Sequence, residues 1–571
     1  MNNTQIADIF DKIADILELK GENPFKIRAY RRGAVSIRSM PQEVSEFAKS
    51  NPLTSLPGIG KDLSEKITEL INTHSLKYYE DLKKATPAGL LDIMTIPGVG
   101  PKTTKLLYDS LNIDSIEKLK KHAQQHKLSK LPHLKEKTEQ NILEGISFLE
   151  KSSGRMLLAN AVSAAESAID YLKKAAPGAV FSAAGSTRRM KDTIRDIDIL
   201  AASKKPKTVM DAFVHMPHVD KISSSGETKS SILTKENIQI DMRVVDPSSY
   251  GAALVYFTGS KEHNVGLRHL AMKRGLKINE YGVFKHNTNK RIAGKTEQEV
   301  YKSVGLEFIP PELRENRGEI EAAAKAKLPK LIEAKDIKGD LHAHSDYSDG
   351  KHKLQDIAQY CKEIGYEYIA ITDHSKSLKI TGGLSEEALA KKNKEIDALN
   401  KKIKGIKILK GAEVDIDSQG QLDYSDDILK DMDVVIAAIH TSFKQPKDIM
   451  TKRILKAMDN KYVHIIAHPT GRLLNTREAC QVDLNAVIKH AKDTKTAIEI
   501  NGNPQRLDLD DIHAKQAAEI GVKIVLTTDM HRLEQFEYMR FCVSVARRAW
   551  LTKACVLNTL SASAFLQALR K

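Results

Sequence analysis

The sequence is poor in cysteine and has no long apolar run. Its four cysteines are scattered without a Cys-x-x-Cys pair, so they indicate neither a disulfide framework nor a zinc ribbon. No apolar stretch reaches the roughly 18 residues that a membrane span requires. The first residues, MNNTQIADIFDKIADILELKG, lack the charged start and apolar core of a secretory signal. We therefore expect a cytoplasmic protein with no membrane partner.

Length and charge limit the organisation and the partners of the chain. A chain of 571 residues exceeds what one hydrophobic core usually supports, so we expect three or four domains. The formal net charge is +15 and the pI is about 9.2. This excess of positive charge favours a polyanionic partner, most simply a nucleic acid.

The first part of the chain contains a repeat. Residues 5–19 carry apolar side chains at helical spacing, which predicts an amphipathic helix. The later segments LTSLPGIGKDLSEKI, from Leu53, and MTIPGVGPKTTKLL, from Met94, both read as a Pro-Gly-x-Gly turn before a helix. The free N–H groups of such a helix start can bind a phosphate oxygen. The segments resemble helix-hairpin-helix motifs, which grip DNA backbones, although one copy alone would equally suit an ordinary helix–turn–helix connection. The candidate DNA-binding residues are Gly58, Gly60, Gly98 and Gly100.

Three carboxylates mark the middle of the chain. In VFSAAGSTRRMKDTIRDIDILAA, Asp196 and Asp198 lie two apart on a predicted strand, so their side chains share one face. IQIDMRVV adds Asp241 from another strand. Three neighbouring carboxylates repel one another unless cations lie between them, as in a two-metal phosphoryl-transfer site. The alternative is that Asp-x-Asp marks only a solvated strand end. Backbone N–H groups for a triphosphate would come from Gly185 and Ser186, and positive charge from Arg189.

Two further segments, YFTGSKEHNVGLR (256–268) and KINEYGVF (277–284), strengthen this interpretation. Together with GSTRR, DIDIL and IDMRV they resemble the family X DNA polymerases, the group that contains DNA polymerase beta. The resemblance implies that the three aspartates bind Mg²⁺. Ile194 and Arg195 depart from the family pattern just before Asp-x-Asp, and Met190 replaces a glycine. The nucleotide contacts implied are Gly185, Ser186, Arg189, Tyr256, Phe257, Gly259, Asn264 and Arg268.

The resemblance to this family extends to the N-terminal region. NPFKIRAYRRGAVSI and LPGIGKDLSEKI are similar to the small lyase domain of the family, and Lys66 aligns with its Schiff-base lysine. A lysine nucleophile needs a lowered pKa, from desolvation or from a cationic neighbour. Asp62 stands where the family has another phosphate-binding lysine. The alternative is that Lys66 lies on an exposed amphipathic helix.

The last 230 positions contain nine residues of the types that bind metals. Most follow short apolar runs such as YIAITDHS, VVIAAIH and VHIIAHP, which read as buried parallel strands. Barrel folds carry their chemistry at the C-terminal ends of such strands, so these residues can converge. A single histidine would more often be a hydrogen-bonded core or surface residue, but nine at strand ends indicate a site for two or three divalent ions. The nine are His342, His344, Asp349, His374, Glu413, His440, His468, Asp529 and His531.

The same nine residues carry a second resemblance. DLHAHSDYSDG, TDHS, AHP and TDMH resemble motifs of the PHP (polymerase and histidinol phosphatase) superfamily over roughly residues 336–571. The resemblance implies a distorted (β/α)₇ barrel that hydrolyses phosphoesters with Mn²⁺ or Zn²⁺, and in which Glu413 bridges the ions.

These features predict a multidomain α/β chain. The stretch ENRGEIEAAAKAKLPKLIEAKD is charged and alanine-rich, which is typical of a linker with some helix. We expect a helical lyase-like DNA-binding domain at 1–85, helix-hairpin-helix fingers at 86–150, a nucleotidyltransferase palm at 151–245, an α+β thumb at 246–315, a linker at 316–335 and the PHP barrel at 336–571.

Taken together, the chain is similar to a bacterial- or archaeal-type family X polymerase with a C-terminal PHP domain. The resemblance implies a monomeric enzyme of DNA repair, including base excision repair, that fills gapped or nicked DNA from dNTPs. Its PHP domain would be a 3′-5′ exonuclease, with AP endonuclease and 3′-phosphatase as further activities. The alternatives are a PHP nuclease that keeps the polymerase core as a DNA-binding scaffold, a small-molecule phosphatase of histidinol-phosphate type, and a non-catalytic tether for DNA ends.

Overall fold

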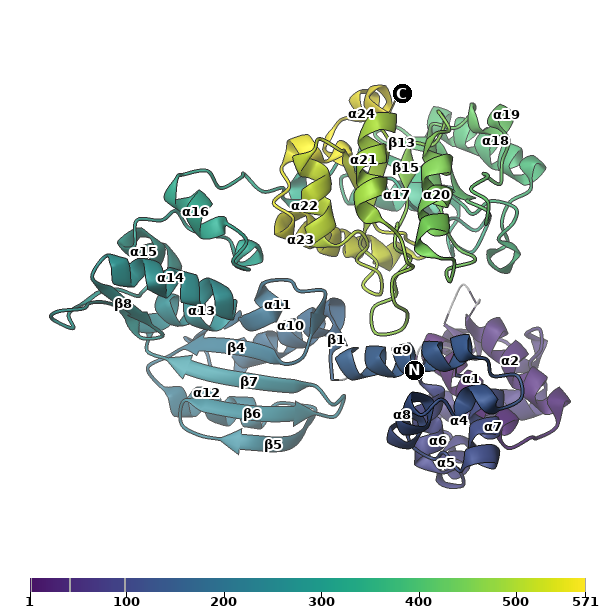
Figure 1. Ribbon diagram of the computed structural model, residues 1–571, viewed down its shortest axis with the longest axis horizontal. Coiled ribbons are helices and arrows are strands. Elements are labelled where there is room, and N and C mark those ends of the chain that lie inside the picture. The colour runs from purple at the N-terminus through teal and green to yellow at the C-terminus, as the bar shows by residue number, and fades with distance from the viewer. Residues whose placement is uncertain (2, 39, 41–42, 97–98, 153, 570–571) are drawn as a thin grey trace. The chain divides into compact units, whose positions relative to one another are not determined.

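The computed structural model describes residues 1, 3–38, 40, 43–96, 99–152 and 154–569 (Figure 1). The chain forms two compact units, Met1–Ser153 and Gly154–Lys571. Among the described residues, no helix is both long and apolar enough to cross a membrane.

The described residues of the first unit are helical. Apolar side chains at every third or fourth position bury one face of the first helix, and Ile6, Phe10 and Ile13 have no exposed surface. The helix predicted for residues 5–19 is thereby confirmed. The elements are α1 (Asn3–Leu19), α2 (Pro24–Arg38), α3 (Val44–Phe47), η1 (Leu53–Ser55), α4 (Lys61–Thr73), α5 (Lys77–Lys84), α6 (Ala88–Met94), α7 (Pro101–Leu111), α8 (Ile116–Gln124), η2 (Leu128–Lys130) and α9 (Glu136–Ser152).

A five-stranded sheet begins the second unit. Its strand order is β2-β4-β7-β6-β5, and only the central β4–β7 pair is parallel. Alternate residues of β7, such as Ile240 and Met242, are buried in the core, so Asp241 lies on the opposite face. The elements are β1 (Met156–Leu157), α10 (Leu158–Ala175), β2 (Val180–Ala183), α11 (Gly185–Arg188), β3 (Thr193–Ile194), β4 (Ile197–Ala202), α12 (Pro206–Val214), β5 (Val219–Ser225), β6 (Lys229–Thr234) and β7 (Gln239–Val245).

A smaller α+β region with its own hydrophobic core follows the sheet. Its strands form an antiparallel sheet in the order β10-β9-β8, and Leu267, Val283 and Tyr301 are buried within it. Ile320, from the stretch expected to be a linker, packs into the same core. The elements are η3 (Pro247–Ser249), α13 (Tyr250–Thr258), α14 (Lys261–Lys273), β8 (Leu276–Asn279), β9 (Gly282–Lys285), β10 (Arg291–Ala293), α15 (Glu297–Ser303), η4 (Pro311–Leu313) and α16 (Glu319–Ala324).

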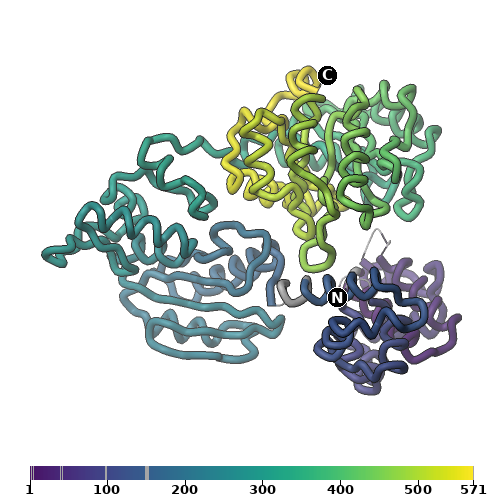
Figure 2. Tube along the Cα trace, viewed as in Figure 1, coloured from purple at the N-terminus to yellow at the C-terminus, as the bar shows by residue number. Residues whose placement is uncertain are grey.

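The remainder of the second unit is a barrel of seven parallel strands, which confirms the predicted (β/α)₇ architecture. The strands pair in sequence order from β11 to β17, and helices cover them on the outside (Figures 1 and 2). The strands are β11 (Gly339–Asp340), β12 (Tyr368–Ile371), β13 (Lys407–Asp415), β14 (Val434–Ala438), β15 (Ile465–Ile466), β16 (Ala497–Asn501) and β17 (Ile524–Thr527).

The helices of the barrel alternate with its strands. Most connect one strand to the next, as in a βαβ unit. They are η5 (Ala334–Asp336), α17 (Leu354–Glu363), η6 (Lys379–Thr381), α18 (Glu386–Lys402), α19 (Asp426–Leu429), α20 (Lys447–Met458), α21 (Leu484–Thr494), α22 (Asp511–Glu519), η7 (Leu533–Tyr538), α23 (Met539–Arg548), η8 (Lys553–Cys555), η9 (Leu557–Thr559) and α24 (Ala562–Ala568).

The first and last strands of the barrel meet at a seam. In the part of the chain that the structure describes, β11 and β17 share no ladder, and one parallel bridge joins Ala343 to Met530. The fully buried Asn558 side chain fills the gap: its amide group donates to the carbonyls of Gly339 (3.0 Å) and Leu526 (2.6 Å). The Asn558 amide therefore takes the place of a missing peptide unit between the two strands.

Candidate active sites and nucleic-acid interface

The three aspartates of the middle region lie together on the five-stranded sheet. Asp198 in β4 is paired directly with Asp241 in the parallel strand β7, and Asp196 precedes β4 by one residue. Burial, together with the neighbouring charges of Asp196 and Asp241, raises the pKa of Asp198 to about 7. This repulsion favours binding of a cation between the carboxylates, so the arrangement fits the Mg²⁺ site expected from the sequence.

A glycine turn brings backbone N–H groups next to these carboxylates. Gly185, the first residue of α11, has φ +56, and a Cβ at this position would lie 2.1 Å from the Asp198 carboxylate oxygen Oδ2. Only glycine fits this approach. Met190 also has a positive φ, +54, at the position where the family carries a glycine. Met190 therefore adopts the left-handed backbone conformation that favours glycine.

The predicted nucleotide contacts line one cavity of about 430 Å³ beside the aspartates. The structure thus brings together residues from α11, α13 and α14, and it adds Thr258 and Lys261, which the sequence did not single out. Asp241 lines the adjoining pocket with Arg243. The predicted residues in the cavity are Gly185, Ser186, Arg189, Asp196, Asp198, Tyr256, Phe257, Gly259, Asn264 and Arg268.

Buried ion pairs hold the wall of this cavity in place. Arg188 donates both to the Thr258 hydroxyl (2.7 Å) and, through two nitrogens, to the two carboxylate oxygens of Glu297 (2.9 and 2.7 Å). The fully buried Arg314 donates to the same Glu297 at 2.7 Å. Burial raises the pKa of Glu297, but Arg188 and Arg314 outweigh this effect and lower it. This network fixes the orientation of the turn that carries Arg188 and its neighbour Arg189.

The Pro-Gly-x-Gly segments form helix starts with open faces. Gly60 and Gly100 precede α4 and α7, and neither helix has a side-chain cap at its first turn. A Cβ at either glycine would meet nothing within 4 Å, which leaves room for a DNA backbone to approach. Gly58 has φ +77 in the turn, whereas Gly98 lies outside the described residues.

Lys66 does not lie on an open helix face. Its side chain is only 16% exposed, pairs with Asp62, and has its ammonium nitrogen Nζ 5.1 Å from the centre of the Tyr78 ring. The structure therefore places Lys66 on α4 in a semi-enclosed position next to a carboxylate.

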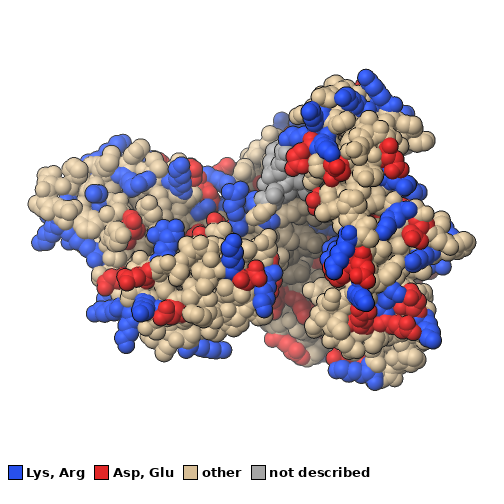
Figure 3. Space-filling model, turned by 90° about the horizontal axis from the view of Figure 1, so that it is seen from below, with Lys and Arg blue, Asp and Glu red and all other residues tan. Residues whose placement is uncertain are grey.

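Positive charge is spread widely over one face of the molecule. Figure 3 shows lysine and arginine side chains over the visible face, with aspartate and glutamate among them. Such a distribution fits contacts with phosphates at several places better than a single sequence-reading patch.

The nine metal-type residues of the barrel converge at the C-terminal ends of its strands. Eight of them form three groups whose ligand atoms lie within 4.8 Å of one another. The ninth, His468, has its Nε2 atom 3.0 Å from Glu413 Oε1. The three groups are His344, Asp349, His374 and His531; His342, His344 and Asp529; and His374, Glu413 and His440.

Glu413, in β13, lies at the centre of this cluster. Its Oε2 atom is 2.8 Å from His374 Nδ1, and its Oε1 atom is 3.2 Å from His440 Nε2. The side chain is 1% exposed, and its distances to His342 and His344 are 3.5 and 3.7 Å. One carboxylate in reach of five imidazoles fits the expected bridging ligand.

Two groups of the cluster have ionisation states that suit metal binding, whereas neighbouring carboxylates outweigh burial and raise the pKa values of His342, His440 and His531. Burial and the neighbouring imidazoles of His531 and His374 lower the pKa of His344 to about 4, so this ring is neutral at pH 7 and offers a lone pair. Burial opposes ionisation of Glu413, but the surrounding histidines outweigh it and hold its pKa well below the usual range. Among the described residues, the buried His342 Nε2 and His344 Nε2 atoms lack a well-formed hydrogen bond. These atoms fit divalent cations.

A second layer of carboxylates, not singled out from the sequence, orients the histidines. The fully buried Glu499 of β16 accepts from His342 Nδ1 (2.6 Å), from the His468 backbone N–H (2.5 Å) and from the Thr527 hydroxyl (2.5 Å). Asp415 Oδ1 lies 3.0 Å from His440 Nδ1. Such partners fix the tautomer of a metal-binding histidine. Glu499 was detectable as a carboxylate within the apolar strand AIEIN, and Asp415 as a carboxylate two residues after Glu413.

Arg506 is a further residue of the site that the sequence reading missed. Its Nε atom lies 3.4 Å from Asp529 Oδ2, and its side chain is 19% exposed. It therefore brings a positive charge to the edge of the cluster.

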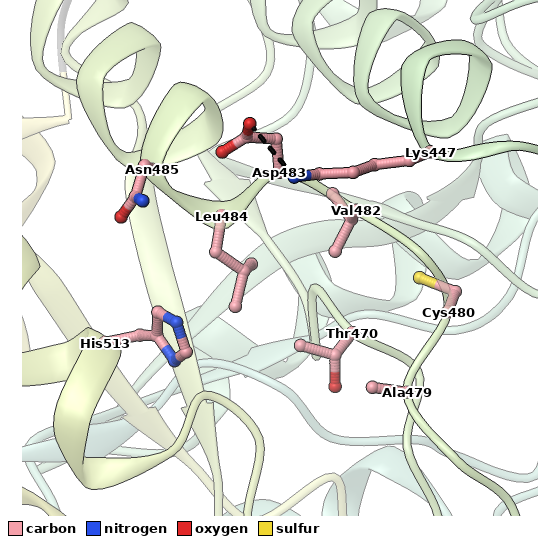
Figure 4. A pocket seen from close by; sticks show the side chains of 9 residues that line it. All are labelled: Lys447, Thr470, Ala479, Cys480, Val482, Asp483, Leu484, Asn485 and His513. Atoms are coloured by element: carbon pink, nitrogen blue, oxygen red, sulfur yellow. Dashed lines mark ion pairs between the residues drawn. The ribbon is translucent and has the colours of Figure 1, made fainter.

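The barrel also has a pocket of about 290 Å³ between the starts of α20 and α21 and the helix α22 (Figure 4). Lys447 and Asp483 pair across its rim at 3.3 Å, and Cys480 and His513 line it. None of the nine metal-type residues lines this pocket, so we assign it no part in the chemistry.

Comparisons with known families divide the chain into four matching stretches. Residues 1–76 match a helix-hairpin-helix domain and 90–147 a SAM-like helix-hairpin-helix tandem. Residues 253–315 match the DNA polymerase beta thumb, and 340–503 match the PHP domain.

Whole proteins show the same pattern. The chain is 39% identical over 563 residues to the DNA polymerase/3′-5′ exonuclease PolX of Bacillus subtilis (strain 168), which covers 98% of both chains. It is 34% identical over 235 residues to a probable phosphatase of Thermoanaerobacter sp. (strain X514), covering 38% of this chain and 89% of that protein. DNA polymerase lambda of Rattus norvegicus is 23% identical over 344 residues, covering 55% of this chain and 56% of that protein.

Proposed function

The chain belongs to the family X DNA polymerases that carry helix-hairpin-helix domains and a C-terminal PHP domain, and we propose that it both extends and trims DNA 3′ ends. The extending activity fills short gaps from dNTPs on a template, and the trimming activity is a 3′-5′ exonuclease. Both activities are metal-dependent, and the substrates are DNA and dNTPs. We propose that the protein acts as a monomer on gapped or nicked DNA.

The observation that carries this proposal is the presence of two separate, complete sets of metal-type side chains in one chain. One set is the Asp196, Asp198 and Asp241 group beside a cavity lined by the predicted nucleotide contacts. The other is the nine-residue cluster of the barrel. Neither set lacks a residue that its family resemblance requires.

At the polymerase site, Asp196, Asp198 and Asp241 would hold Mg²⁺, which supplies charge neutralisation and in-line alignment when bound. The N–H groups at Gly185 and Ser186 and the guanidinium of Arg189 would bind the triphosphate. The rings of Tyr256 and Phe257, whose centroids lie 5.1 Å apart, would form the wall beside the sugar of the incoming nucleotide.

At the barrel site, the cluster around Glu413 would hold two or three Mn²⁺ or Zn²⁺ ions, which polarise the phosphodiester when bound. Glu499 and Asp415 would keep His342 and His440 in the tautomers that face the ions. Arg506 would bind a non-bridging phosphate oxygen. The same chemistry would act on the phosphodiester beside an abasic site and on a 3′-phosphate, since both are phosphoesters.

The test uses a labelled primer on one-nucleotide-gapped DNA with dNTPs and Mn²⁺. We compare wild type with Asp241→Asn and with the double variant His342→Ala/His344→Ala. The proposal expects the first variant only to shorten the primer and the second only to lengthen it. A wild type that only shortens the primer would leave the polymerase core as a DNA-binding scaffold, which is the nuclease-only alternative.

The lyase activity is a separate proposal that rests on Lys66. We propose that this semi-enclosed lysine forms the Schiff base with a 5′-deoxyribose phosphate. Borohydride trapping of the protein on incised abasic DNA tests it, with Lys66→Arg expected to lose the trapped adduct and Lys77→Arg, an exposed lysine of the same unit, expected to keep it. Equal trapping in both variants would contradict the assignment.

A further inference from the structure

A short segment at the end of the thumb connects the polymerase cavity to the barrel. It contains η4 and the residues up to 317, and α23 of the barrel lies against it. Two ion pairs attach it at its ends: Glu312 Oε1 accepts from Arg547 Nε at 2.7 Å, and Arg317 donates to Asp511 Oδ2 at 2.9 Å. The segment therefore joins the polymerase half of the second unit to the barrel.

Arg548, the last residue of α23, sits in the middle of this contact. Its side chain is only 3% exposed. One terminal nitrogen, Nη1, donates to the backbone carbonyl of Arg189 at 2.7 Å and to Glu315 Oε1 at 3.0 Å, and the other, Nη2, donates to Asp511 Oδ2 at 2.7 Å. A buried planar guanidinium with three partners has one available geometry, so its acceptors are fixed with it.

Arg189 is attached to Arg548 in two ways. Its backbone carbonyl accepts directly from Arg548, and its own Nε donates to the Glu315 oxygen that Arg548 also contacts (3.0 Å). A third bond runs from Arg189 Nη1 to the Thr258 carbonyl. With the main chain and one edge of the guanidinium held, the rest of the Arg189 side chain is presented to the cavity beside Asp198.

We propose that Arg548, a residue of the PHP barrel, is a positioning residue for nucleotide incorporation at the polymerase site. It holds Arg189 in the orientation that receives the triphosphate of the incoming nucleotide. The inference rests on the proposed function, since it takes Arg189 to be a triphosphate contact. It means that the barrel contributes to polymerase activity by a route that does not involve its metal cluster.

The neighbouring Arg547 provides a matched control. It lies on the same helix, and it also joins the barrel to this segment, by its bond to Glu312; a second bond runs to the Ile332 carbonyl (3.0 Å). Those partners lie outside the Arg189 network. General loosening of the contact would therefore affect both arginine variants alike, whereas positioning of Arg189 depends on Arg548.

The experiment measures single-nucleotide insertion into one-nucleotide-gapped DNA by the full chain, with KM for the dNTP and kcat determined separately. The variants are Arg548→Gln, Arg548→Lys, Arg547→Gln, Arg189→Gln and the double variant Arg189→Gln/Arg548→Gln. Exonuclease activity of each preparation on single-stranded DNA serves as the check that the barrel is folded.

Loss of the charged hydrogen bonds in Arg548→Gln should raise KM for the dNTP about tenfold, with kcat changed about threefold or less. Arg547→Gln should leave KM within about twofold of wild type, and Arg548→Lys should recover part of the loss because it retains one charged donor. The double variant should have the same KM as Arg189→Gln alone, since both substitutions act on the same contact, that of Arg189 with the triphosphate.

Three outcomes would overturn the inference: an unchanged KM in Arg548→Gln, an equal rise in Arg547→Gln, or effects that multiply in the double variant. These outcomes differ from failure of the proposed function. If wild type inserts no nucleotide, or if Arg189→Gln leaves KM unchanged, the assignment of the triphosphate site itself is wrong. If Arg189→Gln raises KM and Arg548→Gln does not, only the role of Arg548 is refuted.

Discussion

Replacement of Glu499 by glutamine should weaken metal binding in the barrel without removing any ligand. Glu499 Oε1 lies 2.6 Å from His342 Nδ1, and Oε2 accepts from the backbone N–H of His468. A glutamine has one N–H₂ group in place of one of these oxygens. If this group faces His468, two buried donors oppose each other. If it faces His342, the ring proton moves to Nε2, the atom that points into the cluster 3.5 Å from Glu413.

Either orientation disturbs the hydrogen bonds that orient His342. The expected loss of metal affinity is therefore that of removing an orienting partner. Substitution of such partners lowers metal affinity or activity about 10–100-fold, which corresponds to about 1.4–2.7 kcal/mol. The assay is exonuclease activity as a function of free Mn²⁺, together with the metal content of the purified protein. We expect the half-saturating Mn²⁺ concentration to rise by that factor.

The thumb offers a matched control for this substitution. His263 Nδ1 and Glu319 Oε1 also lie 2.6 Å apart, and both side chains are fully buried, as in the His342–Glu499 pair. Like Glu499→Gln, the substitution Glu319→Gln should lower the thermal stability of the protein. Unlike Glu499→Gln, it should leave the Mn²⁺ dependence of the exonuclease unchanged. The reasoning would be refuted by a half-saturation of Glu499→Gln within twofold of wild type, or by an equal shift in Glu319→Gln.

Three other predictions concern the turn, a buried lysine and the ions. Gly185→Ala should reduce nucleotide insertion by about 100-fold or more, because the 2.1 Å approach of a Cβ to Asp198 forces the turn away from the cation site, and insertion and exonuclease assays on one preparation should show only the first falling. Lys392→Met should destabilise the barrel by about 3–5 kcal/mol, measured by denaturant unfolding, because Lys392 is fully buried 3.2 Å from Asp373 and its loss leaves that carboxylate unpaired; an unchanged midpoint would contradict this. Removal of metal by EDTA should lower Tm, and Mn²⁺ at 100 times its Kd should restore about 2.7 kcal/mol, whereas a Tm insensitive to both would show that the cluster binds no ion in the folded protein.

Much of the barrel could be predicted from the sequence because its signal is local. His374, His440 and His468 each follow a short apolar run, so strand and ligand are read together. The same holds for Asp198 and Asp241, which lie on predicted strands. Their direct pairing across β4 and β7 is not a local property, and the sequence indicated only that the strands were neighbours.

The features that escaped prediction depend on residues far apart in the chain. Glu499 looks like an odd polar residue in an apolar strand until β16 is placed beside β15 and β17, where it meets His342 and His468. The hydrogen bond from Arg548 to the Arg189 carbonyl joins positions 359 residues apart, and no periodicity or motif in the sequence indicates it. Packing of whole elements, rather than local pattern, creates such contacts.

The seam of the barrel sets an order of events during synthesis. His342 and His344 follow β11 on one side of the seam, and Asp529 and His531 follow β17 on the other. About 185 residues are made between His344 and Asp529, which takes roughly 10–40 s at ordinary rates of translation. Asn558, which bridges β11 and β17, is made later still. The nascent chain therefore leaves the ribosome with seven of the nine metal-type residues and with one edge of β11 unpaired, and Asp529 and His531 can join the cluster only after β17 has emerged.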